Sequence, residues 1–285
     1  STSTTEAIQY KAGQPAVVDI STENPSIRMV EQAVYFSQDS PGVLFATGLL
    51  VTADIDFEVA WRAPAKEIAD AFGVAIQANS YTATSLLTTA SAAQLRSAAP
   101  VYPDWVLARY LTLPDSLPQR VRALAFDLTR GQTTPYDQAL AIETHLRSYP
   151  YNLDVPAPPP DQDVADYFLF DLKEGYCDYY ATAMVVLSRA AGLPARLVSG
   201  YASGSYDAPN ARYVVTANNA HSWVEIYFSG IGWVEFEPTG GLPTITRRED
   251  ENGLPQAFPE PKPVRHDEFF HWVQGISLQP QCLSW

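Results

Sequence analysis

The feature that most constrains the fold of this chain is a helical segment that is apolar on nearly every face. It follows Gly175 and stops at Gly192, which precedes Leu and Pro in a typical C-terminal signal. Its apolar residues recur at helical spacing: Tyr180, Met184, Leu187 and Ala191. Because such a helix has no polar face to turn towards water, we expect it to be buried at the centre of a domain.

Four strand-like segments follow this helix, with Gly- or Asn-bearing turns between them. They span residues 196–201, 213–216, 221–228 and 232–237. Two amphipathic helices are expected before the central one, at 118–131 and 134–146. An order of helices, one central helix and then successive strands favours an α+β fold with an antiparallel sheet.

The first hundred residues have a different pattern, which indicates strands. Large apolar residues alternate from Ile55 to Trp61, as in a half-buried strand, and residues 27–36 and 42–51 resemble further strands. Residues 65–71 resemble one or two helical turns. The sequence therefore predicts three regions: a β-rich module at 1–101, an α+β domain at 102–245 and an extended Pro-rich tail at 246–285.

The charge and hydropathy of the chain exclude some classes of partner. Its 18 basic and 32 acidic residues give a formal charge of −14, which repels phosphate backbones, so we expect no nucleic-acid partner. The best apolar run, residues 42–51, is about half the length that a membrane-spanning helix needs. The chain begins STSTTEA, without a basic leader. We therefore expect any targeting or membrane segment to lie outside this sequence.

Neither a metal site nor a disulfide framework is expected. Asp161, Asp163 and Asp166 are clustered, but they resemble a helix start and lack the spacing of a calcium loop or a zinc site. The two cysteines, Cys177 and Cys282, have unrelated surroundings. The sequence predicts no cofactor.

Cys177 lies at the expected N-terminus of the central helix. Unpaired backbone N–H groups and the helix dipole stabilise an anion there, which favours the thiolate form of a cysteine. The same N–H groups are suited to bind the oxyanion that forms when a carbonyl is attacked. A cysteine is also a common small core residue, so a purely structural role is the alternative.

A cysteine nucleophile needs a neighbouring base, and histidine is the usual one. The sequence has four histidines. His145 belongs to an amphipathic helix, and His266 and His271 belong to the tail, which leaves His221 at the start of a strand. A histidine in that position is often structural, but a cysteine at a helix start favours the catalytic interpretation.

A third, acidic group would orient the imidazole and stabilise its cationic form. Glu237 on the next strand is our choice, while Glu225 and Glu235 are alternatives that we expect to be surface carboxylates. A three-residue loop at 230–232 puts Glu237 on the face of His221, whereas a loop of two or four residues reverses this. The two residues would still be offset along the strands, so a bulge or strong twist would have to bring them together.

Five blocks of residues, in this order, carry a resemblance to a known family. They are Gly175 to Cys177, Leu187 to Arg196, Gly200 to Tyr201, His221 to Glu225 and Gly232 to Thr239. The chain resembles bacterial transglutaminase-like domains, and most closely those of membrane-anchored members. The resemblance extends upstream through Tyr110 to Pro114 and Tyr102 to Trp105, and covers about residues 102–241.

This resemblance implies a papain-like fold with a Cys-His-acid triad, which maps onto Cys177, His221 and Glu237. Many members have Asp-Pro-Thr where this chain has Glu-Pro-Thr. The longer carboxylate can still accept a hydrogen bond from an imidazole. The membrane-anchored relatives carry the domain outside the cytoplasmic membrane between transmembrane segments, so the resemblance also implies an extracytoplasmic location, periplasmic or at the cell surface.

We therefore expect a thiol enzyme that attacks an amide of a protein or peptide substrate, such as a Gln side chain, and passes the acyl group to an amine or water. A cysteine peptidase or amidase would use the same residues. A non-catalytic extracytoplasmic interaction module is the third alternative, and the presence of both Cys177 and His221 counts against it. Four aromatic residues are predicted to line the substrate cleft, with core packing as the alternative for each: Tyr176, Tyr179, Tyr201 and Trp223.

Overall fold

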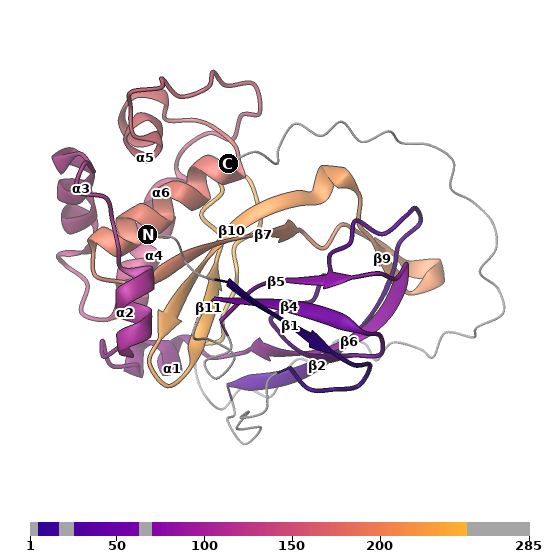
Figure 1. The fold of residues 1–285 in the computed structure, drawn as a ribbon. Helices are drawn as coiled ribbons and strands as arrows, with labels where there is room; N and C mark the ends of the chain where they lie inside the picture. The colour runs from indigo at the N-terminus through magenta and orange to yellow at the C-terminus, as the bar shows by residue number, and fades with distance from the viewer. Residues whose placement is uncertain (1–4, 17–25, 63–69, 250–285) are drawn as a thin grey trace. The chain divides into compact units, whose positions relative to one another are not determined.

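A computed structural model of the chain describes residues 5–16, 26–62 and 70–249 (Figure 1). The described residues up to Ala90 form one compact unit, and those from Ser91 onward form another. The division predicted from the sequence, between 101 and 102, stays a prediction.

The first unit contains two three-stranded antiparallel sheets. One has the order β1-β4-β5, formed by Thr5–Tyr10, Phe57–Arg62 and Ala71–Ile76. The other has the order β2-β6-β3, formed by Ile27–Tyr35, Ser80–Thr88 and Leu49–Ala53. Phe57, Val59 and Trp61 alternate along β4 and are almost completely buried, which confirms the strand predicted from that alternation.

Two predictions for this unit need correction or lie outside the described residues. The strand predicted at 42–51 is wrong over residues 42–48, because β3 begins only at Leu49. Gly42 and Gly48 have φ values of 79° and 69°, a left-handed conformation that interrupts extended chain. The helical turns predicted at 65–71 fall mainly on residues outside the described ranges, and Ala71 belongs to β5. The strands β5 and β6 were not predicted.

The second unit places helices before a small antiparallel sheet. The helices are α1 (Ala92–Ser97), α2 (Asp104–Tyr110), α3 (Gln119–Thr129), α4 (Pro135–Arg147), α5 (Val164–Asp166), the π-helix η2 (Tyr167–Leu172) and α6 (Cys177–Ala190). The strands β7 (Ala195–Tyr201), β10 (Ala220–Phe228) and β11 (Gly232–Phe236) form a sheet of order β11-β10-β7. A separate hairpin pairs β8 (Ser205–Asp207) with β9 (Arg212–Val214), and short 3₁₀ turns cover Ala208–Asn210 and Ala217–Asn219.

The central helix is where the sequence predicts it. Tyr180, Ala183, Met184 and Leu187 are completely buried, because α6 packs between the other helices and the sheet of β7, β10 and β11 (Figure 1). Helices α3 and α4 also match their predicted positions, and Thr134 caps α4 by accepting a hydrogen bond from the backbone N–H of Asp137 at 3.1 Å. The predicted α+β class is confirmed.

The last described residues return to the start of the second unit. The carbonyls of Arg248 and Glu249 accept hydrogen bonds from the N–H groups of Ala92 and Ala93, at 2.7 and 3.3 Å. These contacts satisfy donors at the start of α1 that have no partner inside the helix. Residues 250–285 of the predicted tail lie outside the described residues, and so do His266, His271 and Cys282.

Candidate active site

Cys177 is the first residue of α6, as predicted, and its side chain is partly exposed. The preceding Tyr176 is the N-cap residue and makes no side-chain capping hydrogen bond, so the first N–H groups of the helix remain available to an anion. Gly175 allows the chain to pass close to α6, since a Cβ atom there would lie 3.1 Å from the ring of Tyr179. The local geometry therefore presents a thiol at the positive end of a helix.

A short backbone bridge holds the chain just before the nucleophile. Tyr151 and Gly175 form an isolated parallel β-bridge. The N–H of Asn152 donates to the Gly175 carbonyl at 2.8 Å, and the N–H of Gly175 donates to the Pro150 carbonyl at 3.3 Å. The Tyr180 hydroxyl lies 2.8 Å from the same Pro150 carbonyl. Main-chain contacts thus hold the start of α6.

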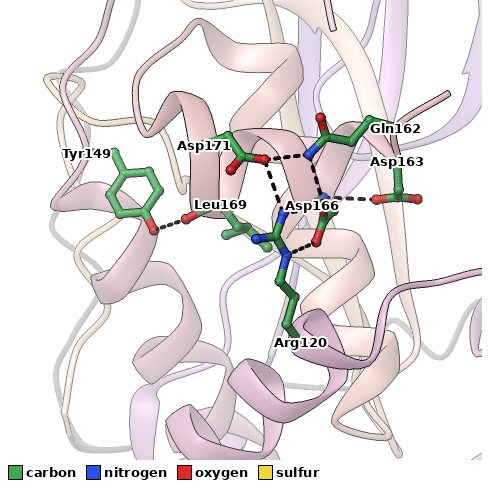
Figure 2. Close-up of polar contacts among 7 residues, drawn as sticks. All are labelled: Arg120, Tyr149, Gln162, Asp163, Asp166, Leu169 and Asp171. Atoms are coloured by element: carbon green, nitrogen blue, oxygen red, sulfur yellow. Dashed lines mark hydrogen bonds and ion pairs between the residues drawn. The ribbon is translucent and has the colours of Figure 1, made fainter. Parts of the chain in front are cut away.

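An ion-pair network joins α3 to α5 and to the π-helix η2 (Figure 2). The guanidinium of Arg120 on α3 binds both oxygens of Asp166, at 2.5 and 2.6 Å, and one oxygen of Asp171 at 3.1 Å. Asp166 and Asp171 are five residues apart, and the wider turn of a π-helix brings such residues to one side. Gln162 donates to both carboxylates, at 3.1 and 2.5 Å. The predicted helix start at Asp163 is also present, because its side chain caps α5.

The hairpin of β10 and β11 brings His221 and Glu237 onto the same face. Phe228 pairs with Gly232, so the loop has three residues, 229–231, one position earlier than predicted. The last pair of this register is Val224 with Phe236. If the register is extended by one residue, Glu237 lies opposite residue 223, two positions from His221. Long side chains can span such a diagonal. His221 Nε2 and Glu237 Oε2 are 2.5 Å apart, and the bulge that the sequence argument required is not needed.

The imidazole of His221 contacts both of the other candidate residues. The side chain of His221 is 10% exposed, and burial by itself lowers its pKa, but hydrogen bonds and negative charge from Cys177 and Glu237 outweigh burial and raise the pKa to about 9. Because Nε2 faces Glu237, Nδ1 is the nitrogen left for Cys177. In this arrangement the imidazole carries a positive charge at neutral pH, beside a sulfur that can become an anion.

Two residues of α4 hold the segment that carries Glu237, and sequence reasoning missed both. The N–H of Glu237 donates to Glu143 at 2.8 Å. Arg147 donates to the carbonyls of Glu237 and Thr239, at 2.7 and 3.1 Å, and the N–H of Thr239 donates to Glu237 Oε1 at 3.0 Å. The available signal was a carboxylate and a guanidinium one turn apart on a helix whose other residues at that spacing are apolar.

The two alternative acids have other environments. Arg196 donates to Glu225 at 2.7 Å, and Glu225 is 9% exposed, so the prediction of a surface carboxylate is wrong for it. Glu235 stands opposite Glu225 in the β10–β11 register. Burial, then the charge of Glu225, raises the pKa of Glu235, while Arg247 lowers it. Among the described hydrogen bonds to imidazoles, the carboxylate partner is Glu237.

The four aromatic candidates differ in exposure. Tyr179 is buried and stacks on Phe168 with ring centroids 5.7 Å apart, which fits the packing alternative. Trp223 stacks beside the imidazole of His221, with centroids 6.1 Å apart. Tyr176 is partly buried, and Tyr201 is 43% exposed. A cleft-lining role for these residues stays a prediction.

Other features of the described residues bear on the chemistry. His145 lies on α4 beside Tyr149, and burial lowers its pKa. Residues 5–16, 26–62 and 70–249 contain no group of three or more His, Cys, Asp or Glu side chains arranged to hold a metal ion. Over the same ranges, we find no helix with the length and apolar character needed to cross a membrane.

Comparisons of the sequence with known proteins give consistent matches. The family model of the Transglutaminase-like superfamily matches residues 122–238. The uncharacterized protein YebA of Bacillus subtilis is 52% identical over 141 residues, which are 47% of this chain and 19% of YebA. A protein-glutamine gamma-glutamyltransferase of Pseudomonas aeruginosa is 35% identical over 150 residues, which are 53% of this chain and 22% of that protein. The chain spans about a fifth of the length of these relatives.

Comparison with solved structures points to a related domain. The crystal structure of the periplasmic domain of TgpA from Pseudomonas aeruginosa superimposes with a TM-score of 0.56 and 25% sequence identity. The match covers 82% of this chain and 75% of the TgpA domain. The papain-like, transglutaminase-like fold expected from the sequence is thereby confirmed.

Proposed function

We propose that this chain is a thiol acyltransferase acting on amide groups of proteins or peptides, because residues 122–238 match the family model of the Transglutaminase-like superfamily. In this proposal Cys177 is the nucleophile, His221 is the acid and base, and Glu237 orients the imidazole. The observation that carries it is the position of His221, whose Nε2 lies 2.5 Å from Glu237 Oε2 and whose pKa is raised by interaction with Cys177 at the N-terminus of α6.

The first half-reaction forms a thioester. The sulfur of Cys177 attacks the amide carbon, a C–S bond forms, and the carbonyl oxygen becomes an oxyanion that the first N–H groups of α6 are placed to bind. His221 then gives its proton to the leaving nitrogen, the C–N bond breaks, and ammonia or an amine departs. Glu237 accepts from Nε2 throughout, which keeps Nδ1 directed at the reacting atoms.

The second half-reaction returns the enzyme to its starting state. An amine or a water molecule attacks the thioester carbon while His221 takes its proton, and the C–S bond breaks with its electron pair going to sulfur. The same residues serve transfer and hydrolysis. The name of the Pseudomonas relative, a protein-glutamine gamma-glutamyltransferase, supports a Gln side chain as donor and an amine as acceptor.

The test compares the wild-type chain with Cys177→Ala on Gln-containing peptides. We expect the wild type to release ammonia and to incorporate a fluorescent primary amine, and the variant to lose at least about 1,000-fold of both activities. Ser188→Ala is a matched control, because Ser188 lies on the same helix as Cys177 and its buried hydroxyl has no hydrogen-bond partner among the described residues. Equal activity of wild type and Cys177→Ala would exclude the nucleophile. Ammonia release without amine incorporation would instead assign hydrolysis.

We also propose that the domain acts outside the cytoplasm, on protein or peptide substrates. The likeness to a periplasmic domain supports this location. The test is to label Cys177 in intact cells that express the full-length natural protein, using a thiol reagent that cannot cross the cytoplasmic membrane. Labelling only after the cells are broken would place the domain in the cytoplasm and contradict the proposal.

A further inference from the structure

The residues that follow the proposed nucleophile and the proposed base are hydrogen-bonded to each other. The hydroxyl of Ser222, next to His221 on β10, donates to Oδ1 of Asp178, next to Cys177 on α6, at 2.7 Å. Ser222 is 5% exposed, whereas Asp178 is exposed. One contact therefore joins the two elements that present the reacting groups, one residue away from each of them.

This contact belongs to a directed chain of hydrogen bonds. The hydroxyls of Ser199 on β7 and Ser222 on β10 are 3.3 Å apart, and these residues are paired in the sheet register. Ser222 has a single hydroxyl proton, which it uses on Asp178, so Ser199 is the donor to Ser222. Hydrogen bonds in series polarise one another, so the chain strengthens the contact with Asp178.

The start of α6 needs an anchor of this kind. Tyr176, the N-cap residue, provides no side-chain hydrogen bond to the first turn. Unpaired N–H groups at a helix start favour fraying unless a cap or a tertiary contact restrains them. Asp178 lies in that first turn, and its Oδ1 is also 3.9 Å from the sulfur of Cys177. Movement of the Asp178 side chain and movement of the thiol are therefore linked.

The charge of Asp178 is not what recommends it for this position. A carboxylate beside a sulfur opposes formation of the thiolate, although an acid in the first turn also interacts favourably with the helix dipole. The dipole interaction requires only the charge and is indifferent to Ser222. The hydrogen bond requires an oxygen acceptor at 178 and a hydroxyl at 222, whatever the charge. This difference separates the two roles experimentally.

We propose that the hydrogen bond between Ser222 and Asp178 is a positioning contact that keeps Cys177 and His221 at their reactive separation. The test by enzyme kinetics rests on the proposed function, whereas the test by alkylation of Cys177 rests on the structure alone. In this role Asp178 and Ser222 do not take part in bond making or breaking; they act by fixing the positions of the residues beside them.

The chemical readout is the rate at which iodoacetamide alkylates Cys177 at neutral pH, which needs no substrate. Ser222→Ala and Asp178→Ala are expected to slow alkylation about 10-fold, because the thiol and the imidazole lose their fixed separation. Asp178→Asn, which keeps an acceptor oxygen, and Ser222→Thr, which keeps the hydroxyl, are expected to restore most of the rate. Ser188→Ala serves as the control for loss of a buried hydroxyl on α6. Melting temperatures should stay within about 5 °C of wild type.

The catalytic readout separates positioning from substrate binding and from a structural role. For release of ammonia from a Gln peptide, Ser222→Ala should lower kcat about 10-fold with KM unchanged. The double variant Asp178→Ala/Ser222→Ala should be no slower than either single variant, because both remove the same contact. Alkylation effects without any ammonia release from the wild type would support the contact and overturn the acyl-transfer proposal.

Two results would overturn the positioning role. One is Asp178→Asn reacting as slowly as Asp178→Ala while Ser222→Ala keeps the wild-type rate, which would assign the effect to charge. The other is rates in the double variant that are the product of the two single effects, which would show two independent contributions.

Discussion

The two sides of the candidate site are held in different ways. On the nucleophile side, Gly175, Tyr176 and Cys177 are consecutive, and main-chain contacts from residues 150–152 hold the chain before α6. On the acid side, Glu237 is held by side chains of Glu143 and Arg147, which precede it by 94 and 90 residues. The chain that enters α6 is thus held largely by backbone hydrogen bonds, whereas the acid is held by polar side chains of another helix.

This difference predicts how each side responds to mutation. Main-chain contacts survive most side-chain substitutions, so Gly175 and the chain that enters α6 should stay in place in most variants. The position of Glu237 depends on a few polar side chains, and a single substitution on α4 can disturb it. Substitutions on the two sides should therefore differ both in size of effect and in which kinetic property changes.

The largest effect is expected from removing the charge of the acid itself. Glu237→Gln should lower kcat about 100-fold. This loss is smaller than the one seen when replacement of a triad acid leaves the histidine in the wrong tautomer, because the amide oxygen of Gln can still accept a hydrogen bond from Nε2 of His221. Burial lowers the pKa of His221, but hydrogen bonds and charge from Cys177 and Glu237 raise it to about 9. Without the carboxylate that pKa falls, so the reactive imidazolium is lost at lower pH.

The measurement is the pH profile of kcat/KM for ammonia release, because His221 must be protonated to give its proton to the leaving nitrogen. The wild-type value should fall as pH rises through about 9, and the Glu237→Gln profile should fall at a lower pH. Glu225→Gln is the matched control, since Glu225 pairs with Arg196 rather than His221. If the fall at alkaline pH occurs at the same pH in Glu237→Gln as in wild type, Glu237 does not raise the pKa of His221.

The next effect should come from the guanidinium that holds the acid segment. Arg147→Met removes donors to the carbonyls of Glu237, Thr239 and Leu242. We expect about 30-fold lower kcat, because Glu237 loses its fixed orientation, and about 2 to 3 kcal/mol lower free energy of unfolding, because buried acceptors lose their partners. Urea denaturation and steady-state kinetics measure the two quantities.

The control for Arg147→Met is Arg130→Met at the C-cap of α3, where Arg130 forms an exposed ion pair with Asp127 at 3.7 Å. An exposed pair of this kind contributes little to stability. If both substitutions had the same effect, the holding role of Arg147 would be lost.

A smaller effect is expected on the nucleophile side. Arg120→Met removes the cation that joins Asp166 and Asp171 across the π-helix. Because main-chain contacts still hold Gly175, we expect kcat to fall only about 3- to 10-fold.

Asp166 is buried, and the Arg120 hydrogen bond, acting against burial, keeps its pKa below 3.8. The stability that this lowered pKa provides is present above pH 3.8 and is lost as pH falls through the lower, folded-state pKa of Asp166. Arg120→Met should therefore lack this part of the pH dependence of the free energy of unfolding. Acid titration of unfolding, followed by circular dichroism, checks it; a kcat loss as large as that of Arg147→Met would contradict the comparison.

The same contrast explains what the sequence could predict. The position of α6 follows from apolar spacing between Gly175 and Gly192, and the identity of His221 follows from elimination among four histidines. The first depends on a short window of sequence and the second on where the other histidines lie, so neither requires a long-range contact. The loop of residues 229–231 was predicted one position late, because Gly230 and Gly232 each suit a turn, and no local pattern distinguishes the two registers.

The contacts that sequence reasoning missed are all long-range. Glu143 and Arg147 resemble ordinary polar residues of an amphipathic helix until the segment that follows β11 is placed beside α4. The π-helix is hidden for a related reason, because its register depends on Arg120 reaching both Asp166 and Asp171 from another helix. Local propensity cannot reveal interactions between residues that meet only after folding.

The smallest effect is expected from Glu143→Gln, which keeps the acceptor for the N–H of Glu237 but removes the charge. Burial raises the pKa of Glu143 above 4.5, against the opposing hydrogen bond from Glu237 and the charges of Arg247 and Arg147. A raised carboxyl pKa means that the folded state holds the proton of Glu143 more tightly than the unfolded state. This group therefore favours folding below pH 4.5, and that contribution is lost as pH rises through the folded-state pKa.

At neutral pH the Glu143→Gln variant should therefore be at least as stable as wild type, with kcat within about threefold. Glu143→Ala, which also removes the acceptor, should be less stable and slower. Urea denaturation at pH 4 and pH 7 distinguishes the cases, and a large loss of activity in Glu143→Gln would show that the charge, not the hydrogen bond, holds the acid side of the site.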